Sequence, residues 1–336
     1  MSLLFSPLKI KDIVFKNRVV ISPMCMYSAV DGFANDWHLV HYGSRAVGGA
    51  GLIIQEATAV SEEGRISTGD LGLFREEHIQ MLGRITSFIH QHGAVAGIQL
   101  AHAGRKGCSD TVAPSAIAFS PDFDEPRALD QEGIRKVISD FRIAATRALK
   151  AGYKLIEIHA AHGYLVHQFL SPLSNHRTDS YGGSFENRIR LLLEILKEIK
   201  SVWPDNLPLF VRISATDWAE GGWDVEEAVQ LASILKDNGV DLIDSSSGGL
   251  VPYQKIPLGP GYQVPFAERI RAESNILTAA VGLITNGRQA EDILQKGQAD
   301  LILIARESLR DPYFPLHAAK LLGEDLAWPR QYLRAK

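Results

Sequence analysis

Two histidines and a tyrosine lie close together near the middle of the chain, at His159, His162 and Tyr164. They directly follow the apolar run 155–158, which is typical of a short buried strand. Imidazole and phenol groups donate hydrogen bonds to an oxygen that gains negative charge, and a phenol can also transfer a proton. Zinc-binding helices carry histidines four residues apart around a glutamate, whereas alanines separate these two. The spacing argues against that metal site and leaves two satisfied core histidines as the alternative.

Eight short apolar runs recur along the 336 residues, and most lack the alternation of half-buried strands. They lie at 19–22, 52–55, 95–100, 155–158, 209–213, 240–244, 276–280 and 301–304. Apolar residues at helical spacing occur between them, at about 77–92, 133–151, 185–199, 225–238 and 286–296. A glycine that could end a helix in the left-handed conformation precedes four runs, at Gly51, Gly152, Gly239 and Gly297.

Eight strand–helix units in this length predict an α/β fold, a single-domain (β/α)8 TIM barrel over residues 1–336. The alternative is an open doubly wound sheet, but such a sheet usually has an early glycine-rich dinucleotide turn, which the sequence lacks. Long connections at 101–132 and 163–184 follow the third and fourth strands, so both should cover the same mouth of the barrel.

The charge and composition argue against several classes of function. The formal charge is −4 without a basic stripe, so we expect no nucleic-acid partner. No apolar run approaches the roughly 20 residues that span a membrane, and no secretory signal is visible. Cys25 and Cys108 form neither a disulfide framework nor an iron–sulfur cluster, so we expect a cytoplasmic protein without a metal site.

Polar residues stand where the apolar runs end, which is where chemistry collects in such barrels. Arg212 within the fifth run needs an anionic partner, and a structural salt bridge inside the barrel is the alternative to a ligand. Gly282 after the seventh run and Ala305-Arg306 after the eighth suggest a phosphate site, although glycine turns alone are usually plain turns. Cys25 is either an inert thiol or a group that touches a cofactor.

Together these residues resemble the Old Yellow Enzyme family of FMN-dependent ene-reductases, and in particular its bacterial, thermophilic-like branch. The most specific motifs are His-x-x-His-Gly-Tyr at 159–164 and Tyr-Gly-Gly-Ser-x-Glu-Asn-Arg at 181–188. Cys25 and His162 point to the bacterial branch, since classical members tend to have threonine and asparagine there. Further matching segments lie at 4–8, 17–19, 22–27, 99–105, 171–175, 310–315 and 331–334.

The resemblance implies that FMN lies on the barrel mouth and implies a role for each matching residue. Those implied to hold FMN are Ser22, Pro23, Met24 and Cys25 beside the isoalloxazine, Ala57 packed by the flavin, Gln99 at its pyrimidine edge, Arg212 at N1/O2, and Gly282, Ala305 and Arg306 at the phosphate. The family more often has glycine at the position of Ala305, whose methyl group leaves less room for the phosphate. Those implied to bind substrate are His159, His162, Tyr27 and, from a neighbouring subunit, Arg334.

The implied activity is that of an NADPH dehydrogenase or ene-reductase, with NADPH or NADH as reductant. It would reduce the activated C=C bond of α,β-unsaturated carbonyl compounds, with hydride from flavin N5 and a proton from Tyr164, and nitro compounds are a further candidate class. The tail 325–336 would lie at the interface of a homodimer or homotetramer. A flavin-free sugar-phosphate lyase or isomerase and a flavin redox sensor are the alternatives.

Overall fold

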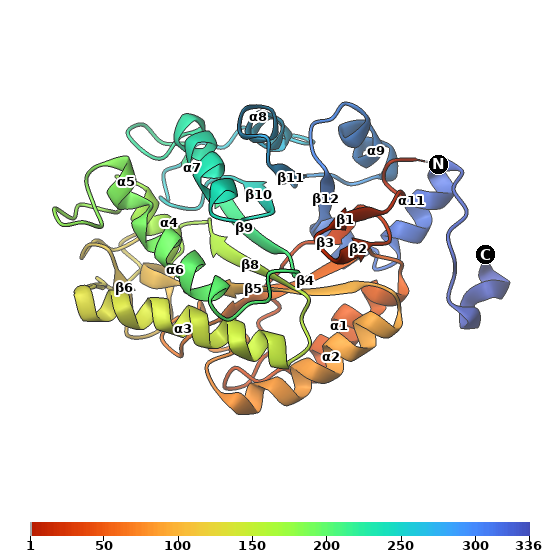
Figure 1. The fold of residues 1–336 in the computed structure, drawn as a ribbon, viewed down its shortest axis with the longest axis horizontal. Coiled ribbons are helices and arrows are strands. Elements are labelled where there is room, and N and C mark those ends of the chain that lie inside the picture. The colour runs from red at the N-terminus through yellow and green to blue at the C-terminus, as the bar shows by residue number, and fades with distance from the viewer. Residues whose placement is uncertain (1) are drawn as a thin grey trace.

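Eight parallel strands close into a barrel at the centre of the computed structural model, which describes residues 2–336 (Figure 1). Each predicted apolar run forms one of these strands, and neighbouring strands follow chain order until the last pairs with the first. The predicted TIM barrel is therefore confirmed. The strands are β3 (Val19–Ile21), β4 (Leu52–Ala59), β5 (Val95–Ala101), β8 (Leu155–Ala160), β9 (Leu209–Ser214), β10 (Leu242–Ser246), β11 (Leu277–Ala280) and β12 (Leu301–Ile304).

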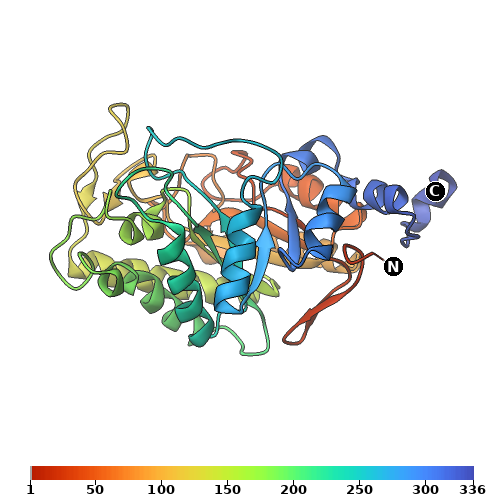
Figure 2. The same cartoon turned by 90° about the horizontal axis from the view of Figure 1, so that it is seen from above.

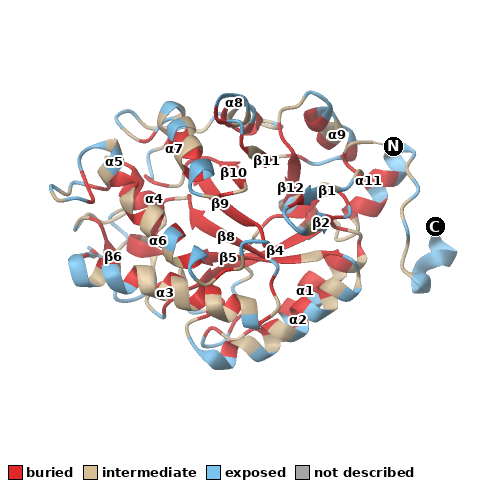
Figure 3. Cartoon of the chain, viewed as in Figure 1, coloured by how far each residue is buried: buried red, intermediate tan, exposed pale blue. Residues whose placement is uncertain are grey.

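Helices surround the barrel and keep its strands away from solvent (Figures 1 and 3). The five predicted helical segments are present, and the segment 185–199 is divided into α5 (Phe185–Arg188) and α6 (Arg190–Lys200). The other helices are α1 (Asp36–Val47), α2 (Ile79–Gln91), α3 (Gln131–Lys150), α4 (Leu165–Leu170), α7 (Val225–Asp237), α8 (Val264–Ser274), α9 (Gly287–Gln295), α10 (Arg306–Arg310) and α11 (Phe314–Leu322). None of the described helices is both long and apolar enough to cross a membrane.

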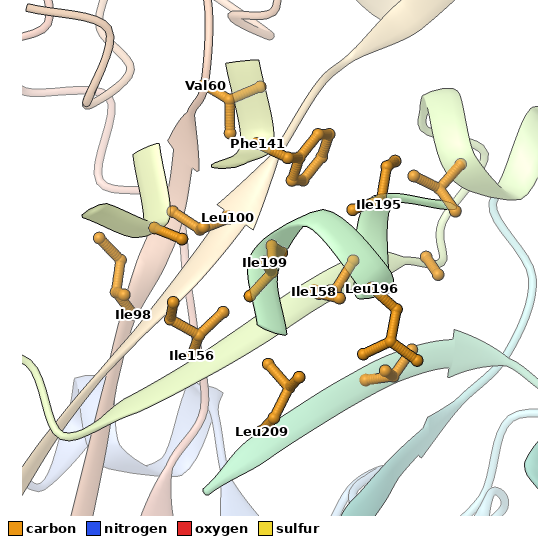
Figure 4. Packing of buried hydrophobic residues seen from close by; sticks show 14 of the residues in the cluster. Val60, Ile98, Leu100, Phe141, Ile156, Ile158, Ile195, Leu196, Ile199 and Leu209 are labelled. Carbon is orange, nitrogen blue, oxygen red and sulfur yellow. The ribbon is translucent and has the colours of Figure 1, made fainter. Parts of the chain in front are cut away.

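The alternation of side chains along β8 explains how the fold positions its polar residues. Ile156 and Ile158 point outward and pack against α3 and α6, in the apolar layer that Figure 4 shows. Their neighbours Leu155, Glu157 and His159 therefore point into the barrel, because successive residues of a strand face opposite sides. Leu155 belongs to the apolar cluster at the bottom of the barrel, so the polar residues follow it toward the mouth.

An amino-terminal hairpin, β1 (Leu8–Ile10) and β2 (Ile13–Phe15), closes the lower end of the barrel. Ile10 and Phe15 join the same interior cluster as Leu155. Figure 2 shows the hairpin toward the face opposite the long connections. One of those connections is more ordered than a plain loop, since it contains the short parallel strands β6 (Val112–Ala113) and β7 (Arg127–Ala128) and the single turn η2 (Gly104–Lys106).

Three of the four predicted glycine joins adopt the left-handed conformation, at Gly152, Gly239 and Gly297. The fourth prediction was wrong, because Gly49 takes this conformation with a φ of +97° and Gly51 does not. Gly51 serves a close approach instead, since a Cβ there would lie 2.3 Å from the backbone oxygen of Asn17.

Candidate active site

His159, His162 and Tyr164 form a compact cluster of rings at the carboxyl end of β8. The ring centroids of His159 and His162 are 5.1 Å apart, and those of His159 and Tyr164 are 5.0 Å apart, both in edge-to-face contact. His162 adopts a left-handed backbone with a φ of +58°, and its N–H donates to Ser214 Oγ at 2.9 Å. This turn of the backbone brings the second imidazole back beside the first.

Both imidazoles are neutral in this environment. Burial lowers the pKa of His159 and of His162 well below the usual value, and the positive charge of Arg212 adds to the effect. His159 Nδ1 accepts a hydrogen bond from the N–H of Ala161 at 3.3 Å. Its proton is therefore on Nε2, which can donate to an oxygen. His162 Nε2 lies 2.7 Å from Ser246 Oγ at the end of β10.

The segment after β3 lies beside this cluster and contributes Cys25 and Tyr27. Burial raises the pKa of Tyr164 above its usual range, and the nearby groups Cys25 and Tyr27 raise it further. Burial also raises the pKa of the Cys25 thiol far above its usual value, so this cysteine is un-ionised at neutral pH. Tyr27 is exposed and has a φ of +51°, which places it on the rim rather than in the interior.

Glu56 on β4 holds this segment in place and was not recognised in the sequence. Its carboxylate accepts hydrogen bonds of 2.8 Å from the N–H of Met26 and from the Tyr42 hydroxyl. Burial raises the pKa of Glu56 to about 7. The next residue, Ala57, is buried at an irregularity in the pairing of β4 with β5, whereas Pro23 and Met24 are half-buried.

Arg212 lies inside the barrel between an acidic partner and the end of β3. Its Nε lies 3.1 Å from Asp244 Oδ2, and its Nη1 donates to Ser22 Oγ at 3.3 Å. On the next strands, Gln99 Nε2 donates to Glu157 Oε1 at 2.8 Å. The salt-bridge alternative for Arg212 therefore holds in part, because the side chain has an internal counter-ion and also lines a cavity.

That cavity has a volume of about 220 Å³ and opens beside the ends of β11 and β12. It brings Arg212 together with three residues predicted for the phosphate, Gly282, Ala305 and Arg306. Gly282 has a φ of +124°, and a Cβ there would approach the side chains of the loop before α8 to 3.1 Å. The lining residues that the sequence did not reveal include Tyr262, Gln263, Leu283 and Thr285.

Lys106 is a further residue of the site that the sequence did not reveal. Its Nζ donates to the backbone oxygens of His162 at 2.9 Å and Gly249 at 3.1 Å, so it joins the loops that follow β8 and β10. It also lies 5.0 Å from the centre of the Tyr164 ring. Burial lowers the pKa of Lys106 to about 8.

Arg334 is the predicted site residue that the chain does not bring to its own site. It lies in the exposed turn η3 (Arg330–Ala335), within a tail that leaves the barrel beyond α11 (Figures 1 and 3). Tyr332 of the tail contacts Tyr313 with ring centroids 6.0 Å apart, which holds the tail near the start of α11.

Comparison with known proteins decides among the alternatives for this mouth. The model of the NADH:flavin oxidoreductase / NADH oxidase family matches residues 3–324. The chain belongs to this family. It is 55% identical over 339 residues to an NADPH dehydrogenase of Listeria monocytogenes serotype 4b (strain CLIP80459), covering 100% of this chain and 99% of that protein.

Solved structures agree with the family assignment and with the resemblance to Old Yellow Enzyme. Morphinone reductase has a TM-score of 0.83 and 29% identity, covering 98% of this chain and 91% of that one. An Old Yellow Enzyme homologue from Zymomonas mobilis has a TM-score of 0.83 and 28% identity, covering 97% and 94%. The protein is thus an oxidoreductase that uses FMN and NAD(P)H. This assignment removes the flavin-free lyase and the non-catalytic sensor.

The residues at the mouth fit FMN. The cavity combines a left-handed glycine, which lets the backbone approach a ligand, with the exposed cation Arg306. Arg212 lines the same cavity and supplies a buried positive charge. His162 lies next to this cavity, since Ser246 contacts His162 and also lines the cavity. His159 and Tyr164 extend the ring cluster from there.

Proposed function

We propose that the protein reduces the activated C=C bond of α,β-unsaturated carbonyl compounds, with His159 and His162 holding the carbonyl oxygen and Tyr164 supplying the proton. The observation that carries the proposal is the cluster of these three rings at centroid distances of 5.1 and 5.0 Å, beside the cavity that Arg212 lines. Two neutral imidazoles suit this role, because each can donate one hydrogen bond without adding a buried charge.

FMN, when bound, supplies the hydride that adds to the β-carbon of the substrate. Negative charge then develops on the carbonyl oxygen, where hydrogen bonds from His159 Nε2–H and from His162 become stronger. If the Ser246 hydroxyl donates to His162 Nε2, the Nδ1–H of that ring remains available to the oxygen. Tyr164 then protonates the α-carbon of the enolate, because this carbon is a stronger base than the phenolate of Tyr164.

For the cofactor we propose the contacts that the resemblance implies. The isoalloxazine ring would lie along residues 22–25 and Ala57, with Gln99 at its pyrimidine edge and Arg212 at N1/O2. The phosphate would lie against Gly282, Ala305 and Arg306, a placement supported by the cavity that these three residues line. Tyr27, on the rim, would line the substrate pocket.

We further propose a homodimer or homotetramer in which the tail 325–336 brings Arg334 into a neighbouring site. Support comes from the exposure of Leu333 and Arg334 on a tail that leaves its own barrel. A measurement of mass in solution tests this, and a monomer with full activity would contradict it. The two free thiols, Cys25 and Cys108, support a cytoplasmic location.

The test of the substrate site is the binding of a phenol or an enone to the FMN-containing protein, followed by flavin absorption. His159→Ala should weaken binding by about 1–3 kcal/mol, the scale of one lost buried hydrogen bond. His176→Ala is the matched control, because His176 is exposed and outside the ring cluster. Equal binding by wild type and His159→Ala would remove His159 from the site.

A further inference from the structure

Two carboxyl side chains lie close together inside the barrel, and one of them pairs with a buried cation. Glu157 on β8 and Asp244 on β10 are fully buried and close enough to hydrogen-bond with each other. The cation is Arg212 on the intervening β9, which pairs with Asp244 at 3.1 Å. Two ionised carboxylates beside one guanidinium would leave a net negative charge in the interior, which is strongly unfavourable. One carboxyl group must therefore keep a proton.

The surrounding contacts indicate which carboxyl keeps it. Asp244 has the ion pair with Arg212 and is therefore the group that stays charged. Glu157 Oε1 accepts from Gln99, whereas Glu157 Oε2 is buried without a hydrogen-bond donor within residues 2–336. A proton on Oε2 gives Glu157 a donor for Asp244 and satisfies both groups.

The other groups that face this pair are uncharged. On β5 the neighbour is the neutral amide of Gln99. His159, the next inward-facing residue of β8, is neutral because burial holds its pKa well below the usual value. Burial, reinforced by the charge of Asp244, raises the pKa of Glu157 to about 8, and burial raises the pKa of Asp244 to about 6.

We propose that Glu157 is a proton-holding positioning residue, whose protonated carboxyl accepts from Gln99 and donates to Asp244. The proton completes a chain of contacts from Gln99 through Glu157 and Asp244 to Arg212 and then to Ser22. It commits Gln99 Nε2 to Glu157 and leaves Asp244 as the single counter-ion of Arg212. The contacts of the carboxyl pair alone lead to the proton on Glu157. The effect of this proton on FMN binding rests on the roles proposed above for Gln99 and Arg212.

Loss of the proton should disturb both proposed flavin contacts together. The two carboxylates then repel each other and compete for Arg212, while Gln99 faces a charge. We expect FMN affinity to fall roughly tenfold between pH 7 and pH 9, the scale of one altered charge-assisted hydrogen bond. Glu157→Gln retains an acceptor for Gln99 and a donor for Asp244 but cannot ionise, so its FMN affinity should fall less than that of wild type over this range, with any remaining fall due to Lys106, whose pKa is about 8.

The experiment combines infrared spectroscopy with FMN titration, on the holoprotein and on variants. Wild type should show the carbonyl stretch of a protonated carboxylic acid that disappears around pH 8, and Glu157→Gln should lack it. Glu194→Gln is the control, because Glu194 is a carboxylate of the outer layer that accepts from Tyr181. Among the other buried acids, the band of Glu56 should titrate nearer pH 7 and that of Asp244 nearer pH 6.

The proposal is overturned if Glu157→Gln keeps that band or follows the wild-type pH profile of FMN affinity. Failure of every variant to bind FMN would count against the proposed flavin contacts, while the infrared band would still decide the position of the proton. Should Glu157→Gln not fold, Asp244→Asn is the second variant. It removes the negative charge beside Glu157, so the band should then disappear at a lower pH than in wild type.

Discussion

Replacement of Arg212 by methionine should destabilise the protein, because it leaves Asp244 buried without its counter-ion. The Arg212 side chain is 7% exposed and that of Asp244 only 1%, so solvent cannot replace the lost partner. Removing one member of such a buried pair typically costs about 3–5 kcal/mol. The hydrogen bond to Ser22 Oγ at 3.3 Å contributes about 1 kcal/mol at most. We therefore expect a loss of about 3–5 kcal/mol at pH 8, measured by urea unfolding.

The loss should depend on pH with a definite sign. The pKa of Asp244 is already raised to about 6 by burial, and Arg212 is the group that holds it down. Without Arg212 that pKa rises further, so the folded state binds more protons than the unfolded state above roughly pH 4. Stability of the variant must then fall as pH rises through the folded-state pKa. At pH 5 the loss should be much smaller than at pH 8.

A double variant separates the stranded charge from other effects. Arg212→Met combined with Asp244→Asn removes both members of the pair and should recover most of the stability lost at pH 8. Both variants lack Arg212, so any loss of stability caused by weaker FMN binding to the missing guanidinium is the same in the two. Equal losses at pH 5 and pH 8, or a double variant no more stable than the single one, would refute the reasoning.

Two further substitutions test the loops around the mouth. Lys106→Met keeps the apolar stem but removes the donors to the His162 and Gly249 carbonyls. Alkene reduction, measured by rapid-mixing kinetics, should therefore slow roughly tenfold or more. An unchanged rate would show that Lys106 does not hold the loops. Gly282→Ala forces a side chain into a φ of +124° and should cost about 1–3 kcal/mol while weakening FMN binding. Gly259→Ala, where a Cβ meets nothing within 4 Å, should leave FMN binding unchanged in the same fluorescence titration.

The barrel could be predicted because its strands are covered on both faces and are therefore almost continuously apolar. The hairpin β1–β2 could not, since strands of three residues are too short to show a period. The hairpin places Ile10 and Phe15 in the core, but the sequence does not distinguish these two apolar residues from those of an unstructured amino-terminal segment.

Charged residues within apolar runs give the strongest signal for the site. Arg212 was recognised because a guanidinium is out of place in a buried strand. The same argument applies to Glu157 and Asp244, which stand in equally apolar runs. Lys106 gave no such signal, because its loop carries no periodicity and its partners are backbone oxygens of residues far along the chain.

The most direct test of the central claim follows the two half-reactions of Tyr164→Phe separately by rapid mixing. The phenol hydroxyl is needed only to protonate the substrate, so reduction of the flavin by NADPH should remain near the wild-type rate. Reduction of an enone should slow about 10²–10⁴-fold, the usual contribution of a positioned general acid. Equal slowing of both half-reactions, or no slowing of enone reduction, would contradict the assignment of Tyr164 as the proton donor and the mechanism built on it.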